Sequence, residues 1–318
     1  MGYATRSRPA KPVFLPCIMG PTGAGKTAAA LALASAFDAS VINADSRQVY
    51  KDFPIITAQP SAEEQSACPH LLYGFLGCEQ KLGAGAYARA AGRSIDAETQ
   101  KGRLPLLVGG TGLYFKALLS GIAPIPPVPP DIAARWQRRC EEEGGAALHA
   151  LLTKVDPAYA GKIHPHDRQR LTRALAVWEA TGKTFSWWHD RELPGTPYLA
   201  CKIGIGLPLA QLEGPLAGRI DLMLEAGALE EARTALNVCP DPAAPGWSGI
   251  GCAELYRHLA REISLEECKA LWLKNTRAYA KRQHTWFRAD PDIRWFAPWQ
   301  ISDIVEHVRQ ARRIAGQR

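Results

Sequence analysis

The octapeptide GPTGAGKT at residues 20–27 constrains the fold of this chain more than any other feature. It fits the pattern G-x-x-x-x-G-K-[ST] at every fixed position, and such a loop points its backbone N–H groups inward at phosphates. The lysine and the N-terminal end of the following helix add positive charge, and the last hydroxyl can ligate Mg²⁺. We therefore expect Mg²⁺ as cofactor, with Thr27 as its ligand, and a diphosphate or triphosphate bound by Gly20, Pro21, Thr22, Gly23, Ala24, Gly25, Lys26 and Thr27.

The segments around this loop alternate between strand and helix patterns. The apolar run VFLPCIM (13–19) predicts a buried strand before the loop, and KTAAALALASAF (26–37) predicts a helix after it. SVINADS (40–46) predicts a second strand ending at Asp45, and residues 104–121 repeat the order of strand, glycine turn and helix. This alternation is typical of an α/β fold with a parallel sheet covered on both faces.

A helical segment interrupts this pattern. The proline-dense PIPPVPP (124–130) predicts an extended linker, after which Asp131 is positioned to cap a helix that stops at Gly144. Asp167 is positioned to cap a second helix, and CKIGIGL (201–207) predicts a return to the sheet. We therefore expect a core of residues 11–122 and 200–318 and a helical insertion of residues 123–199. From about Gln211 the chain is expected to be helical, with 302–313 as its last helix.

Composition limits the partners and the compartment. The net charge of +7 and the pI near 9.0 favour a polyanionic partner without identifying it. The eight cysteines include no C-x-x-C pair, so a zinc site of paired ligands or a disulfide framework is not predicted. The N-terminus lacks the apolar core of a signal peptide, and no apolar run is long enough to span a membrane. We expect a cytoplasmic monomer with no membrane partner.

The ends of the predicted strands weigh against a nucleotide hydrolase. Such an enzyme usually carries an Asp after a strongly apolar strand, but LPLLV ends in Gly109 and Gly110. Asp45 ends a strand that is only half apolar. At the carboxyl end of a parallel strand it can accept a proton or bind a metal, or it can cap the next turn, and its position alone does not decide between these roles.

A basic helix is expected near the C-terminus, in KNTRAYAKRQHTWFR (274–288). Lys274, Arg277, Lys281, His284 and Arg288 are three or four residues apart, so they share one face of the helix. This basic stripe suits the phosphate backbone of a nucleic acid, but a solvated face with aromatic residues packed in the core explains it as well. The sequence RQRLTR (168–173) is an ordinary amphipathic pattern, and no role is assigned to the pair Trp187 and Trp188.

Five segments together carry a resemblance to a known family. GPTGAGKT, NADSRQVY, VGGTGLYFKALLSG, HDRQRLTRAL and TRAYAKRQHTWFR occur in this order, and the chain resembles the tRNA dimethylallyltransferase family from about residue 12 to residue 295. The resemblance implies transfer of a dimethylallyl group from dimethylallyl diphosphate to N6 of the adenosine on the 3′ side of the anticodon, with release of diphosphate. The tRNAs are those that read codons starting with U. The implied fold is a P-loop kinase-like core with a helical insertion that contacts tRNA.

The resemblance also implies roles for single residues. Lys26, Thr27 and Arg219 would stabilise the diphosphate, and Asp45 would be the general base on the adenosine amino group. The tRNA contacts would come from three parts of the chain: Asp45, Ser46, Arg47, Gln48 and Thr111; Arg135, Gln169, Arg170, Leu171, Thr172 and Arg173; and Lys281, Arg282, Gln283, His284, Thr285, Trp286, Phe287 and Arg288.

Some positions depart from the family pattern, and other functions compete with this one. The departures are Arg47, Gln59, Pro215, Cys252 and Ala253. The competing functions are an enzyme that prenylates a free adenine nucleotide, a P-loop kinase of a small metabolite, and an RNA-binding module that uses nucleotide as a switch. The basic stripe and the insertion would have no function in the nucleotide-prenylating enzyme or in the kinase. Turnover of dimethylallyl diphosphate would exclude the kinase and the RNA-binding module.

Overall fold

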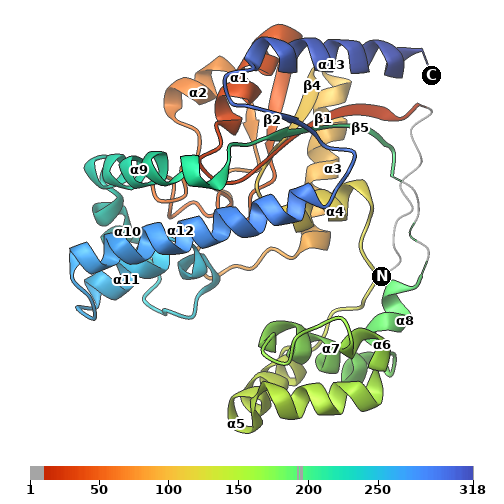
Figure 1. Ribbon diagram of the computed structural model, residues 1–318, viewed down its shortest axis with the longest axis vertical. Helices are drawn as coiled ribbons and strands as arrows, with labels where there is room; N and C mark the ends of the chain where they lie inside the picture. The colour runs from red at the N-terminus through yellow and green to blue at the C-terminus, as the bar shows by residue number, and fades with distance from the viewer. Residues whose placement is uncertain (1–10, 192, 194–195, 318) are drawn as a thin grey trace. The chain divides into compact units, whose positions relative to one another are not determined.

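The computed structural model describes residues 11–191, 193 and 196–317. The chain divides into two compact units (Figure 1). The core unit comprises Met1–Leu119 and Thr196–Arg318, and the insertion unit comprises Ser120–Gly195. The expected boundaries at residues 123 and 199 lie close to these limits.

The core unit is built on a six-stranded sheet in the order β3-β2-β4-β1-β5-β6, and all neighbouring strands are parallel. This confirms the predicted α/β fold with a parallel sheet. The strands are β1 (Val13–Met19), β2 (Ala39–Asn43), β3 (His70–Leu71), β4 (Leu104–Gly109), β5 (Tyr198–Ile205) and β6 (Arg294–Phe296). The expectation of helix alone after residue 211 missed β6, because three residues are too short to show a periodicity.

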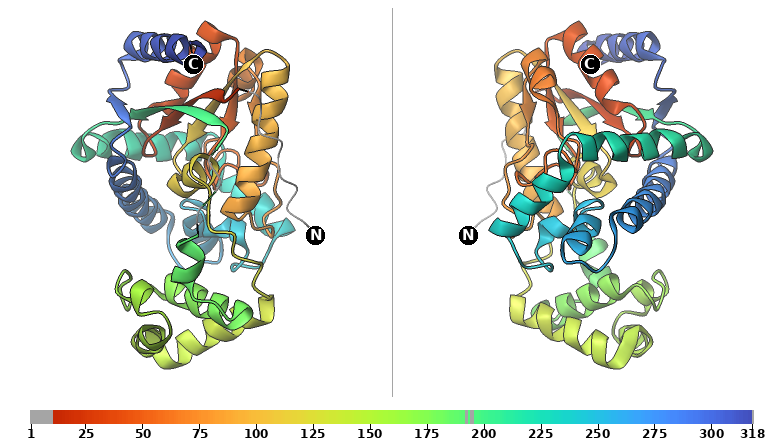
Figure 2. Two further views of the ribbon diagram at one scale, coloured as in Figure 1. Left: turned by 90° about the vertical axis from the view of Figure 1, so that its right-hand side faces the viewer. Right: turned by 90° about the vertical axis from the view of Figure 1, so that its left-hand side faces the viewer.

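Helices cover both faces of this sheet (Figure 2). Successive strand residues point to opposite faces, so Leu106 packs with α1 (Lys26–Phe37) and α13 (Ile301–Gly316), while Leu107 packs with α3 (Ala84–Gln100) and α4 (Gly112–Leu119). Both β2 and β4 are buried along their whole length. Such continuous burial is expected for central strands of a sheet covered on both sides, and the polar Ser40 and Asn43 of β2 are hydrogen-bonded in the interior.

A second group of helices packs beside the carboxyl end of the sheet. It contains α9 (Glu213–Glu225), α10 (Ala228–Val238), α11 (Cys252–Leu259) and α12 (Leu265–Arg288), with the short elements η1 (Leu209–Gln211) and η2 (Pro245–Ser248). The short helix α2 (Ala62–Ala67) instead contacts α1. The pairs Glu213–Arg277 and Asp221–Lys269 join α9 to α12 at 2.7 and 2.8 Å. The second pair joins a later residue of α9 to an earlier residue of α12 than the first pair does, so the two helices are antiparallel.

The insertion unit consists of α5 (Pro130–Val155), α6 (Pro157–Ala160), α7 (Arg168–Thr181) and α8 (Phe185–His189) around its own apolar cluster. Asp167 caps α7 as predicted, since its side chain accepts from Arg170 N. One prediction was wrong, because Asp131 lies inside the first turn of α5, which begins at Pro130. The predicted break at Gly144 is confirmed, since Gly144 has a non-helical φ of 82° and ψ of 162°, and α5 consists of two helical parts joined by a kink there.

Other local features complete the fold. No helix among residues 11–191, 193 and 196–317 is long and apolar enough to cross a membrane. All eight cysteines are free and buried, as expected for reduced thiols. The segment FSWWH (185–189), which contains Trp187 and Trp188, forms α8, and Thr184 caps this helix by accepting from Trp187 N.

Candidate active site

The phosphate loop lies between β1 and α1, as the sequence predicts. Gly25 is the N-cap of α1 with a φ of 83°, and Gly23 has a φ of 76°. L-residues with a side chain rarely adopt these left-handed conformations, so glycine is required at both positions. The loop thereby turns sharply enough to present its N–H groups together at the start of the helix.

The side chain of Lys26 folds back over this loop. Its Nζ donates to the carbonyl oxygens of Gly20 and Pro21 at 3.1 and 2.7 Å. Burial lowers the pKa of Lys26 to about 8; the Asp45 carboxylate opposes this shift, and the Arg219 guanidinium adds to it. Two neighbouring cations with little access to water attract a negatively charged ligand, and such a ligand would stabilise the charged form of Lys26.

Asp45 lies in the turn after β2, which ends at Asn43, two residues before the predicted end at Asp45. Its Oδ1 accepts from Arg47 N at 2.8 Å, which fixes the turn, and its carboxylate also lines the cavity described below. Thr111 holds the same turn, because its N–H donates to Ala44 O and its Oγ1 accepts from Ser46 N. The carboxylate therefore caps the turn, one of the two roles left open by the sequence, and it also faces the cavity.

Gln283 connects α12 to the phosphate loop. Its Oε1 accepts from Thr22 N at 2.9 Å, and its Nε2 donates to Gly110 O at 2.9 Å. The side chain is 5% exposed, and a Cβ on Gly110 would lie 2.1 Å from its Nε2. Gln283 thus fastens the loop after β1 to the turn after β4 and leaves room for no side chain at Gly110.

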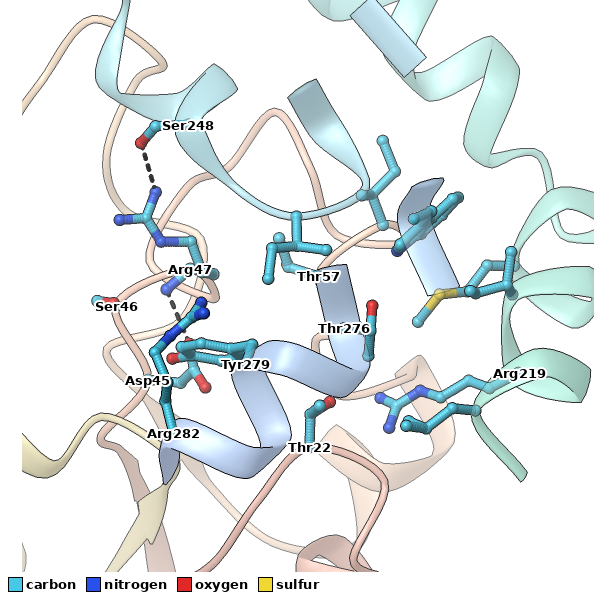
Figure 3. Close-up of a pocket in the computed structure, with 16 residues that line it drawn as sticks. Thr22, Asp45, Ser46, Arg47, Thr57, Arg219, Ser248, Thr276, Tyr279 and Arg282 are labelled. Atoms are coloured by element: carbon cyan, nitrogen blue, oxygen red, sulfur yellow. Dashed lines mark hydrogen bonds between the residues drawn. The ribbon is translucent and has the colours of Figure 1, made fainter. Parts of the chain in front are cut away.

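A cavity of about 280 Å³ opens where these segments meet (Figure 3). Thr22, Asp45 and Arg219 point into it, and Tyr279 and Arg282 of α12 lie beside Asp45. Side chains of one apolar cluster line the apolar end of the cavity: Ile56, Ile220, Met223, Ile250 and Trp272. Leu216 and the polar residues Ser46, Arg47, Thr57, Ser248 and Thr276 line the rest. The cavity is therefore amphipathic, since charged, polar and hydrocarbon groups all line it.

Burial changes the acid–base properties of two groups in this cavity. It lowers the pKa of the Arg219 guanidinium, although nearby Asp45 and Glu64 oppose the shift. It raises the pKa of Tyr279, whose hydroxyl also hydrogen-bonds the side chain of Thr111. The Tyr279 hydroxyl therefore remains protonated at neutral pH, beside the carboxylate of Asp45.

Thr27 is the first candidate for a metal ligand. Its side chain is exposed at the start of α1. The described parts of the chain contain no cluster of three or more His, Cys, Asp or Glu side chains suited to a metal. Mg²⁺ commonly takes one or two protein ligands and completes its coordination with phosphate oxygens and water, so a hydroxyl next to a phosphate loop fits this ion.

The basic stripe lies on the solvent side of α12. Lys274, Arg277, Lys281 and Arg288 are exposed, and the first three also line a groove of about 540 Å³ whose floor includes Leu212 and Leu216. Arg282, Thr285 and Trp286 are exposed as well, and His284 is half-buried. Phe287 and Gln283, expected to contact tRNA, are instead 2% and 5% exposed. Their side chains belong to the interior, which corrects that expectation.

The insertion presents its candidate contacts on its own surface. Gln169, Arg170 and Arg173 are exposed and Thr172 is half-buried, but Leu171 is fully buried in the apolar cluster and cannot offer its side chain to RNA. Arg135 donates to Glu179, and Arg170 lies 3.4 Å from Asp167. Trp187 and Trp188 are half-buried, and the Arg191 guanidinium lies 3.8 Å from the Trp187 ring centre.

Three departures from the family pattern, Arg47, Gln59 and Pro215, have local explanations, and nothing in the structure explains Ala253. Arg47 donates to Ser248 Oγ at 2.8 Å and to Pro245 O, and so holds η2 beside the cavity. Gln59 donates to Tyr50 O at 2.7 Å. Pro215 is the third residue of α9, where its missing N–H has no helical acceptor. Cys252 is fully buried. Gln48, expected to contact tRNA, donates to Thr57 O and Ala58 O.

Several site residues were not predicted from the sequence. Tyr279 and Trp272 lie seven residues apart on one face of α12, and Met223 lies four residues after Arg219 on α9. Their periodicity matches that of any core-facing residue, so only the packing of α9 against α12 distinguishes them.

Comparisons with known proteins agree with this geometry. A family model described as IPP transferase matches residues 48–290, and one described as isopentenyl transferase matches residues 13–71. The chain is 59% identical over 300 residues to a tRNA dimethylallyltransferase of Oleidesulfovibrio alaskensis, covering 94% of this chain and 97% of the relative. It is 60% identical over 289 residues to that of Nitratidesulfovibrio vulgaris, covering 91% and 94%.

Two solved structures are similar over most of the chain. One is a tRNA isopentenylpyrophosphate transferase of Bacillus halodurans, with a TM-score of 0.71, 31% identity and coverage of 96% of this chain and 98% of that one. The other is a eukaryotic dimethylallyltransferase acting on tRNA, with a TM-score of 0.78, 27% identity and coverage of 95% and 78%.

Proposed function

The chain belongs to the IPP transferase family, and from this premise we propose that its cavity joins a dimethylallyl group to tRNA. The donor is dimethylallyl diphosphate, and the acceptor is N6 of the adenosine on the 3′ side of the anticodon, in tRNAs that read codons starting with U. The observation that carries this proposal is the amphipathic cavity, in which a carboxylate, a guanidinium and a phosphate loop surround one space beside apolar walls.

In the reaction, the bond between C1 and oxygen of the donor breaks, and a bond between C1 and N6 of the adenosine forms. The C1–O bond of the allylic diphosphate breaks with partial carbocation character, and its electron pair leaves with the diphosphate. The loop N–H groups, Lys26 and Arg219 stabilise this developing charge. The target base must leave the anticodon-loop stack to enter the cavity, at a cost of a few kcal/mol.

Asp45 is the proposed general base. The N6 lone pair forms the bond to C1, and the carboxylate accepts the proton that N6 loses. Its Oδ1 is held by Arg47 N, so the carboxylate enters the reaction in a fixed orientation. Thr27 would hold Mg²⁺ together with diphosphate oxygens, and the ion would supply further neutralisation of the leaving group.

The proposed setting follows from the substrates. We place the protein in the cytoplasm, together with its tRNA substrate. We propose that it acts as a monomer, because residues of a single chain line the cavity. Free-nucleotide prenylation is disfavoured, since the similar proteins are named for tRNA and α12 carries an exposed basic stripe.

A transfer assay tests the function directly. Labelled dimethylallyl diphosphate and Mg²⁺ are incubated with unmodified tRNA that has adenosine 3′ of the anticodon, and AMP and ATP run beside it. We expect label in tRNA alone. Label in a free nucleotide would show that the protein prenylates free adenine nucleotides. ATP turnover without transfer would show that the loop belongs to a kinase.

A further inference from the structure

Helix α9 places three side chains along the cavity in a fixed order. Leu216 lies against the phosphate loop, since a Cβ on Gly23 would be 2.7 Å from its Cδ2. Arg219 follows one turn later and Met223 one turn after that, about 6 Å further along the axis at a rise of 1.5 Å per residue. A donor with its diphosphate at the loop and Arg219 therefore extends its hydrocarbon toward Met223.

The other walls at this apolar end are held in place. Trp272 is 3% exposed, and Gly251 lies so close that an added Cβ would be 2.6 Å from its indole. Ile56 is 4% exposed, and the carboxylate of Glu231 accepts from the N–H groups of Ile55 and Ile56 at 2.7 and 2.9 Å. These side chains cannot retreat from a longer ligand without disturbing the apolar cluster to which they belong.

Met223 differs from them because it is half-buried at the edge of the same cluster. From these positions, and resting on the proposed function, we infer that Met223 limits the length of the isoprenoid that the cavity accepts. Its side chain takes the space that the second isoprene unit of a ten-carbon allylic diphosphate would need. Dimethylallyl diphosphate ends before this side chain, and geranyl diphosphate collides with it.

The test compares transfer of dimethylallyl and geranyl groups to the same unmodified tRNA. We expect the wild-type protein to strongly prefer the five-carbon donor. Met223→Ala should raise kcat/KM for geranyl diphosphate at least about tenfold, in the range by which hydrophobic pockets discriminate substrates of different size. Met223→Val should give a smaller gain, and Met223→Leu, which conserves volume, should give almost none. Leu222→Ala on the same helix is the matched control, because Leu222 is 65% exposed.

The outcomes separate this inference from the function on which it rests. If the wild-type protein transfers neither group, the proposed function fails. If it transfers dimethylallyl groups while the Leu, Val and Ala variants gain no geranyl transfer in that order, the inference alone is overturned. Equal use of both donors by the wild-type protein would overturn it too. Should Met223→Ala not fold, the Val and Leu variants still decide the order.

Discussion

The cavity of the core unit and the surface of the insertion unit use their polar side chains in opposite ways. In the cavity, Asp45 and Gln283 are fixed by hydrogen bonds to backbone groups of neighbouring segments. In the insertion, Arg135 and Arg170 are more than half exposed, and each is paired with an acidic residue of its own unit.

This difference matches two physical tasks. Bond formation needs reacting groups held to a fraction of an ångström, and a buried, hydrogen-bonded side chain loses its freedom during folding rather than during the reaction. Attraction of an RNA backbone needs positive charge within a Debye length, which long exposed side chains supply without a fixed geometry. Substitutions in the cavity should therefore change the chemical step and donor use, whereas those on the basic surfaces should change tRNA binding and its salt dependence.

The largest effect is expected at Asp45. Asp45→Ala should fold and bind tRNA but lower kcat by about 10²–10⁴, the usual contribution of a general base. Asp45→Asn sharpens the test, because its amide oxygen can still accept from Arg47 N while it cannot take up a proton. Single-turnover rates with saturating tRNA measure both variants, and wild-type rates in either would remove Asp45 as the base.

Lys26 should give the cavity a pH dependence. Its pKa is lowered to about 8, so the ammonium is present below that pH and is lost as the pH rises through it. We expect kcat/KM for the donor to fall above pH 8, by up to about 10² when the charge is gone. In Lys26→Arg the guanidinium stays charged, so the decline should disappear at a lower overall rate. An identical decline in that variant would assign the titration to another group.

Substitution of Gln283 tests whether its hydrogen bonds to the phosphate loop and to Gly110 are needed for donor binding. Gln283→Leu leaves Thr22 N and Gly110 O without their partner, at about 1–3 kcal/mol for each buried group. We expect the KM for the donor to rise about tenfold, which corresponds to about 1.4 kcal/mol, and the melting temperature to fall. Gln283→Glu retains the acceptor for Thr22 N but sets a carboxylate oxygen against Gly110 O, so it should raise the donor KM at least as much. A rise in the KM for tRNA alone would restore Gln283 as an RNA contact.

On α12, charge reversal of Lys281 and Arg282 should act on the other substrate. Both side chains are exposed, and we expect the KM for tRNA to rise more than that for the donor. The slope of log affinity against log salt should decrease by about one for each tRNA phosphate that the helix no longer neutralises. The double reversal Arg312→Glu and Arg313→Glu makes the same change of charge on α13, the helix that packs with α1, and it should alter neither value. Equal effects on both substrates would argue against the basic stripe.

The smallest effect is expected in the insertion. Arg170 is 58% exposed and paired with Asp167, so Arg170→Glu should raise the KM for tRNA only about two- to fivefold at low salt. The effect should vanish at high salt. A loss of kcat with unchanged tRNA affinity would mean that this side chain takes part in positioning the base.

The sequence predicted the parts of this site that are contiguous. The loop at 20–27, the parallel sheet and the position of Asp45 near a strand end follow from local patterns, because phosphate binding and strand burial each require particular residues in succession. The same reasoning failed where residues close together in the sequence lie in different environments of the folded chain. Within the run 281–288, Lys281 faces solvent while Gln283 and Phe287 are buried, and the motif alone does not separate them.

By itself, therefore, the sequence determined that the chain folds around a phosphate loop on a parallel sheet, and its resemblance to a family indicated the substrates. Only the tertiary structure decided that Gln283 of α12 holds Thr22 of the loop, and that Met223 and Trp272 enclose the apolar end of the same cavity. The reason is physical. A turn or a strand is specified by neighbouring residues, whereas a cavity is the space left where helices far apart in the chain pack together, and its shape depends on all of them at once.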